Sequence, residues 1–112
     1  MSNQWERVLD ALGDGSRRRI VELLAAGPRP VGAIAADLPI GRPAVSKHLK
    51  VLADAGLVRH DSEGTRNVYA LAPEGLIELR RWLADTWDHV LGSFAAYVDT
   101  VDVSRRPEQE EP

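Results

Sequence analysis

The chain has 112 residues, no cysteine and a formal net charge of −3 at pH 7. This length suits one domain with a modest core, and forming an oligomer would bury further apolar surface. The lack of cysteine excludes disulfides and thiolate metal sites. No leader-like segment and no apolar run of about 20 residues is present, so we expect a soluble, cytoplasmic protein.

The first part of the sequence predicts two helices. Apolar residues from Trp5 to Leu12 recur at i, i+3, i+4 and i+7, which is one face of a helix. Ser16 is a suitable N-cap for a second helix. The three arginines at 17–19 oppose the dipole at the start of that helix. Carboxylates such as Asp14, or a DNA phosphate, would compensate this cost, and we expect ion pairs with acids.

Two further helices follow, joined by a tight turn. Apolar residues at 31–38 keep the helical spacing, and a fourth helix is expected from about 42 to 55. Pro43 suits the first turn of this helix, and Gly56 is the left-handed residue expected beyond its end. Because β-branched and aromatic runs come next, we expect a β-hairpin at about 57–71. The predicted fold is mainly helical with a small hairpin, in the order α-α-α-α-β-β-α, which is a helix-turn-helix followed by a wing.

The last predicted helix carries a long apolar stripe. Its residues are spaced by three and four from Leu76 to Val101, as in a coiled coil. A small domain has little room to bury such a stripe, so we expect it to pack against a second copy together with the first helix; the alternative is that it covers only its own core. The polar segment 104–112 is expected to be a disordered tail after a domain at 1–103. The residues assigned to the dimer interface are Trp5, Val8, Leu12, Leu83, Trp87, Val90, Phe94 and Tyr97.

The fourth helix has an apolar face and a basic face. Val45, Leu49 and Leu52 share the stripe that must face the core. No acid lies between Asp37 and Asp54, so the opposite face is locally positive although the chain is acidic. Residues at the start of a recognition helix reach base edges, and wing arginines reach phosphates or the minor groove. The residues assigned to DNA are Arg42, Pro43, Ala44, Ser46, Lys47, His48 and Lys50, with Arg66 in the wing.

These DNA assignments have plain structural alternatives. His48 lies between the two faces, so it is either a partly buried histidine bonded to the backbone or a phosphate ligand. Arg66 is either a DNA contact or an ordinary exposed arginine of a hairpin. A basic helix face taken alone is most often a solvated surface, and the turn and hairpin around it are what favour DNA.

Three stretches together resemble the arsenic-repressor (ArsR/SmtB) family of winged-helix transcriptional regulators. They are "LGDGSRRRIVELLAAG", "RPAVSKHLKVLADAGLV" and "SEGTRNVYAL", and the resemblance covers roughly residues 4–100. The family's fold implies a homodimer that reads a partly palindromic operator with two recognition helices and two wings.

The metal ligands of many family members are missing from this sequence. Ile34 and Ala36 stand where one family site has a Cys-x-Cys pair, and the spacing around His89 does not match the family site in the last helix. Asp85 and His89, at i and i+4, provide only half of some other zinc site. We therefore expect no metal and no cofactor.

Enzymatic chemistry also lacks support. Ser46 and His48 point to different sides of one helix, so they cannot act as nucleophile and base. We expect a transcriptional regulator, acting as a repressor, whose partners are double-stranded DNA and a second copy of the chain. One alternative is a winged-helix module that binds an acidic protein instead of DNA. Another is a regulator controlled by a small molecule held between the last helices, near Trp82 and Trp87.

Overall fold

The computed structural model describes residues 3–101, apart from the side chain of residue 63. The predicted tail at 104–112 lies outside the described residues. The chain divides into two compact units, Met1–Arg80 and Arg81–Pro112, so the boundary falls inside the last helix.

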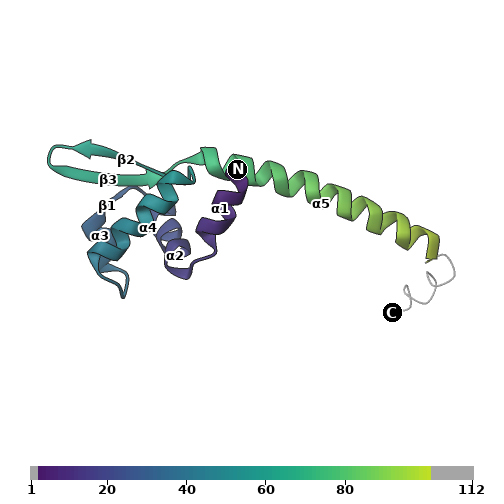
Figure 1. Ribbon diagram of the computed structural model, residues 1–112, viewed down its shortest axis with the longest axis horizontal. Coiled ribbons are helices and arrows are strands. Elements are labelled where there is room, and N and C mark those ends of the chain that lie inside the picture. Colours follow the sequence, from purple (N-terminus) through teal and green to yellow (C-terminus); the bar gives the residue numbers. More distant parts are fainter. Residues whose placement is uncertain (1–2, 102–112) are drawn as a thin grey trace. The chain divides into compact units, whose positions relative to one another are not determined.

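The first unit is a winged helix of the predicted, mainly helical class (Figure 1). Sequence reasoning missed one element, a two-residue strand that pairs antiparallel with the wing, with Arg29 opposite Tyr69 and Pro30 opposite Val68. The sheet therefore has three strands in the order β1-β3-β2. The elements are α1 (Gln4–Leu12), α2 (Gly15–Ala25), β1 (Arg29–Pro30), α3 (Val31–Ala36), α4 (Arg42–Asp54), β2 (Val58–Glu63), β3 (Arg66–Leu71) and α5 (Pro73–Val101), which continues into the second unit.

The core of the first unit lies between the helices and the base of the wing. The stripe assigned to the core on α4 is confirmed, since Val45, Leu49 and Leu52 are each 1% exposed or less. Ile20 of α2 and Ile34 of α3 are fully buried with them. One face of α4 is thus committed to the core, and this leaves the opposite face to solvent.

A Schellman motif ends α4 and turns the chain into the wing. Gly56 has φ +82°, the left-handed conformation predicted for it. Its N–H donates to the carbonyl of Ala53 at 3.0 Å, and the Leu57 N–H donates to that of Leu52 at 2.9 Å. Leu52 and Leu57 are both buried, which adds the apolar contact typical of this motif.

The wing is a regular hairpin with a two-residue turn. Its strands pair from Val58 opposite Leu71 to Glu63 opposite Arg66. Gly64 has φ +65° in the turn, as the first residue of such a short hairpin loop requires. The end of the hairpin extends beyond the helices of this unit (Figure 1).

The start of α2 differs from the sequence prediction. Asp14, not Ser16, is the N-cap, and its carboxylate accepts the backbone N–H of Arg17 at 3.0 Å. The guanidinium groups of Arg17 and Arg18 bind carbonyl oxygens and not the Asp14 carboxylate. Arg17 Nε donates to the carbonyl of Ala11 at 2.6 Å and Arg18 Nη1 to that of Leu12 at 2.7 Å. Both guanidinium groups thus cap the C-terminus of α1, where unpaired carbonyls and the helix dipole favour a cation.

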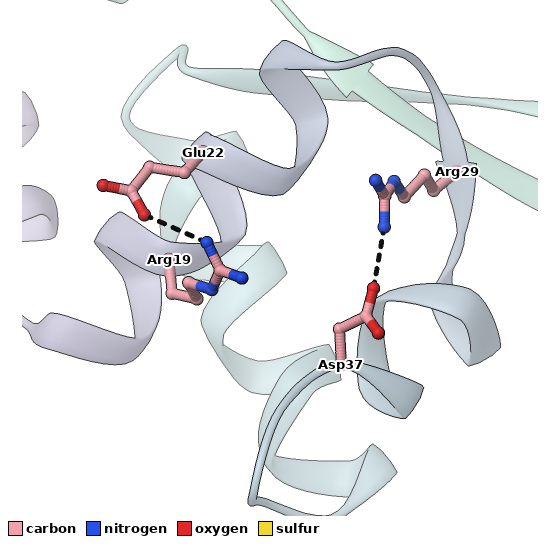
Figure 2. Close-up of polar contacts among 4 residues, drawn as sticks. All are labelled: Arg19, Glu22, Arg29 and Asp37. Carbon is pink, nitrogen blue, oxygen red and sulfur yellow. Dashed lines mark hydrogen bonds and ion pairs between the residues drawn. The ribbon is translucent and has the colours of Figure 1, made fainter.

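Figure 2 shows two of the ion pairs on the surface of the first unit. Arg19 does form the expected kind of pair, with Glu22 on the same helix at 3.4 Å. Arg29 of β1 binds Asp37, just after α3, at 2.9 Å. The second pair ties the added strand to the helix that precedes the turn.

In the second unit, the described residues 81–101 all belong to α5. Large apolar side chains are exposed along this part of the helix: Trp87 is 53% exposed, Phe94 60% and Tyr97 63%. No helix within residues 3–101 has both the length and the apolar character that a membrane span needs.

Candidate nucleic-acid interface

Most of the residues assigned to DNA share the exposed face of α4. Ala44 and His48 are half-buried at the edge of this face, and Arg66 is exposed at the start of β3, beside the turn of the wing. The structure therefore brings the α4 residues together. The exposed members on α4 are Arg42, Pro43, Ser46, Lys47 and Lys50.

The N-terminus of α4 is positive for two reasons. Gly41 is the N-cap in an extended conformation, and no acid occurs in the first turn, so the positive end of the helix dipole is not neutralised there. Pro43 lies in the first turn, where the backbone N–H that proline lacks would have no partner within the helix. The basic side chains of Arg42 and Lys47 add to this potential, which favours an anionic ligand.

Arg42 is held close to α3. A Cβ placed on Gly32 would lie 3.6 Å from Nη2 of Arg42, so the guanidinium group covers this glycine. The two helices of the helix-turn-helix therefore contact each other through the first residue of α4. Lys47 is different, because no described residue forms an ion pair or hydrogen bond with its side chain.

Lys50 is paired within its own helix. Its Nζ lies 3.3 Å from Oδ2 of Asp54, and the two side chains are 77% and 66% exposed. Such an exposed pair is weak, so Lys50 can exchange Asp54 for another anion at little cost.

A groove of about 240 Å³ separates the exposed face of α4 from the wing. The wing contributes His60 and Tyr69, and the helix contributes Ser46, Leu49, Lys50, Ala53 and Asp54. The rings of His60 and Tyr69, which are directly opposite in the strand register, have centroids 5.3 Å apart. Sequence reasoning did not assign these two rings to the site, although the two-residue period of the hairpin offered a signal, because it puts opposite residues on one face.

The sequence left His48 as either a histidine bonded to the backbone or a phosphate ligand, and the structure shows it in contact with a side chain. Its Nδ1 lies 3.3 Å from Nη1 of Arg17. A guanidinium group can only donate, so in this contact Nδ1 is the acceptor. Arg17 thus links the end of α1 to α4.

Asp14 should make folding stability depend on pH in the acid range. The hydrogen bond from the Arg17 N–H, reinforced by the Arg17 charge, lowers the pKa of Asp14 below its ordinary value of 3.8. Because the pKa of Asp14 is lower in the folded state than in the unfolded state, its carboxylate stabilises the fold fully at pH values above the unfolded-state pKa. This contribution is lost as the pH falls through the folded-state pKa. Asp14→Asn keeps a capping oxygen but cannot titrate. Urea midpoints measured from neutral to acid pH should therefore fall less steeply for the variant; parallel curves would contradict this account.

The described residues contain no cluster of three or more histidine or acidic side chains placed to hold a metal. Asp85 and His89 both lie on α5 and are exposed.

The residues assigned to a dimer interface do not all reach the surface. Val8 is fully buried in the first unit, so its side chain belongs to the core and offers no surface to a partner. This corrects its assignment to the interface. Trp5 and Leu12 are half-buried on α1. On α5 the exposed fractions range from 37% for Leu83 to 63% for Tyr97, and Trp87, Val90 and Phe94 fall between them.

Known proteins that resemble this chain are regulators of transcription, and the similarity includes α4. A helix-turn-helix domain family matches residues 12–61. The HTH-type transcriptional regulator Rv2034 of Mycobacterium tuberculosis is 52% identical over 95 residues, which cover 85% of this chain and 89% of that protein.

Two solved structures share the fold. One is an ArsR-like transcriptional regulator from Rhodococcus sp. RHA1, with a TM-score of 0.77, 26% identity and coverage of 88% of this chain and 92% of the other. The second is the homodimeric winged helix-turn-helix DNA-binding domain of Mb0332 from Mycobacterium bovis, with a TM-score of 0.62, 38% identity and coverage of 79% and 82%. These relatives are regulators of transcription and not enzymes, and this chain belongs to the ArsR/SmtB family of winged helix-turn-helix transcriptional regulators.

Proposed function

We propose that this protein is a sequence-specific repressor that binds a partly palindromic operator as a homodimer. The recognition helix, at about 42–55, enters the major groove, and the wing, at about 57–71, lies on the adjacent backbone or in the minor groove. The observation that carries this proposal is the exposed basic face of α4 opposite its fully buried apolar stripe.

The dimensions of α4 support insertion into DNA. A helix with side chains is about 10–12 Å across, which matches the roughly 12 Å width of the major groove. Arg42, Ser46 and Lys47 are exposed near its N-terminus, the end that contacts bases in helix-turn-helix proteins. Arg and Lys donate to guanine O6 and N7, and half-buried Ala44 allows a close approach.

The net charge of −3 does not oppose this binding. Screening limits the reach of an exposed charge to a Debye length of about 8 Å at physiological salt. Between Asp37 and Asp54 the chain has three basic residues and no acid, so DNA at α4 meets a positive surface. The acidic remainder weakens binding to random DNA and favours discrimination.

The exposed apolar side chains of α5 support dimerisation. They recur at coiled-coil spacing, and exposed aromatic residues such as Trp87 and Phe94 are typical anchors of interfaces. The homodimeric state of the Mycobacterium bovis relative agrees with this arrangement. A two-fold dimer presents two recognition helices, and a protein seated on both half-sites blocks that DNA to others.

Selection from random duplexes tests the function. We expect enrichment of a two-fold symmetric sequence whose half-site centres lie about one helical turn, or a multiple of it, apart. Footprinting on the promoter of its own gene should show the same symmetric protection with and without zinc, because Ile34 and Ala36 replace the family's cysteine pair.

Two results would contradict these expectations. No enriched sequence, together with binding to an acidic protein that survives Lys47→Glu, would replace the regulator with a protein-interaction module. Loss of the footprint on adding zinc would show a metal site that the sequence does not reveal.

A further inference from the structure

Asp54 is an acid in an unfavourable place. It is the last residue of α4, where the helix dipole favours a cation, and the last turn of α4 contains no basic residue. Its carboxylate is 66% exposed and lies 3.3 Å from Lys50 Nζ. The pair joins Lys50, a residue assigned to DNA, with the one acid among the residues that line the groove.

Apart from this acid, the polar side chains that line the groove between α4 and the wing are donors that suit a phosphate. Of the side chains that line it, Lys50, Ser46, His60 and Tyr69 can donate hydrogen bonds, while Asp54 alone is acidic. Lys50 is already bound to a carboxylate there, so the groove of the free protein holds an anion supplied by the chain itself.

We propose that Asp54 is a built-in competitor for DNA phosphate at Lys50. In the free protein it neutralises Lys50, and a backbone phosphate that enters the groove displaces it. This inference rests on the proposed DNA binding, and it identifies Asp54 as a residue that weakens that binding. Because the carboxylate then stays within a Debye length of the phosphate, it also repels the bound strand. Asp54 thereby lowers affinity for DNA of any sequence and leaves discrimination to the start of α4.

Asp54→Asn tests the competitor. We expect it to bind both the selected operator and a random duplex about threefold to tenfold more tightly, and the plot of log affinity against log salt to steepen by about one. Its urea midpoint should not fall, since the change removes an acid from a helix C-terminus.

A matched control is available on α2. Glu22 forms an equally exposed ion pair, with Arg19 at 3.4 Å and its own side chain 67% exposed, but it does not line the groove (Figure 2). Glu22→Gln changes the net charge by the same amount and should alter affinity much less. Lys50→Met should remove most of the gain from Asp54→Asn, because the freed lysine is its source.

The outcomes separate this inference from the proposed function. If the natural chain binds no duplex, the function itself fails. If the natural chain binds its operator but Asp54→Asn raises affinity no more than Glu22→Gln does, the competitor is refuted while DNA binding stands. The same holds if Asp54→Asn raises affinity equally in the presence of Lys50→Met.

Discussion

Lys47→Glu should weaken operator binding at least about 100-fold while the protein stays folded. A well-placed basic side chain contributes roughly 1–3 kcal/mol to recognition of its base, and reversing its charge adds repulsion from the phosphates. No described residue pairs with the Lys47 side chain, so the change breaks no ion pair or side-chain hydrogen bond within residues 3–101. Titration of labelled operator, followed by a urea curve, measures both quantities.

Arg19→Glu is the control for this charge reversal. It makes the same change in net charge on α2, at a side chain 54% exposed that the fold uses to bind Glu22. We expect a loss of affinity of only a few-fold, from the added negative charge. Equal losses for the two variants would mean that binding follows net charge and that α4 is not the reading helix.

Gly75→Ala should destabilise the first unit by about 3 kcal/mol. A Cβ at this position would lie 2.5 Å from the carbonyl oxygen of Ala55 and 3.0 Å from both the carbonyl carbon and oxygen of Gly56. These are backbone atoms of the turn that ends α4, so they cannot move aside as a flexible side chain would. The Gly75 N–H also donates to the Gly56 carbonyl at 2.9 Å. Urea unfolding should give a lower midpoint and weaker operator binding, since this turn sets the angle between α4 and the wing.

Gly15→Ala is the matched substitution in the same unit. Gly15 begins α2, and its nearest neighbour would be the end of the Arg18 side chain at 3.7 Å, an ordinary contact. Alanine is a better helix former than glycine, so stability should be unchanged or slightly higher. If both variants unfold at the same urea concentration, the close approach of Gly75 to the turn has no energetic importance.

Local sequence determined the two faces and the end of α4. The spacing of Val45, Leu49 and Leu52 sets which face is buried, because that spacing fixes angles around the helix axis. Gly56 marks the end of the helix for an equally local reason, since glycine takes a positive φ without strain. The basic face and the hairpin could therefore be predicted residue by residue.

Tertiary structure decided the features that depend on residues far apart in the sequence. Strand β1 is too short for a periodic signal and exists because β3 pairs with it. Arg17 could form ion pairs by sequence, but the end of α1 offers carbonyls within its reach. The approach of Gly75 to Gly56, and the groove lined by both Tyr69 and Lys50, arise only when the helices and wing pack together. Helical spacing fixes which way a side chain points, whereas only packing fixes what it meets.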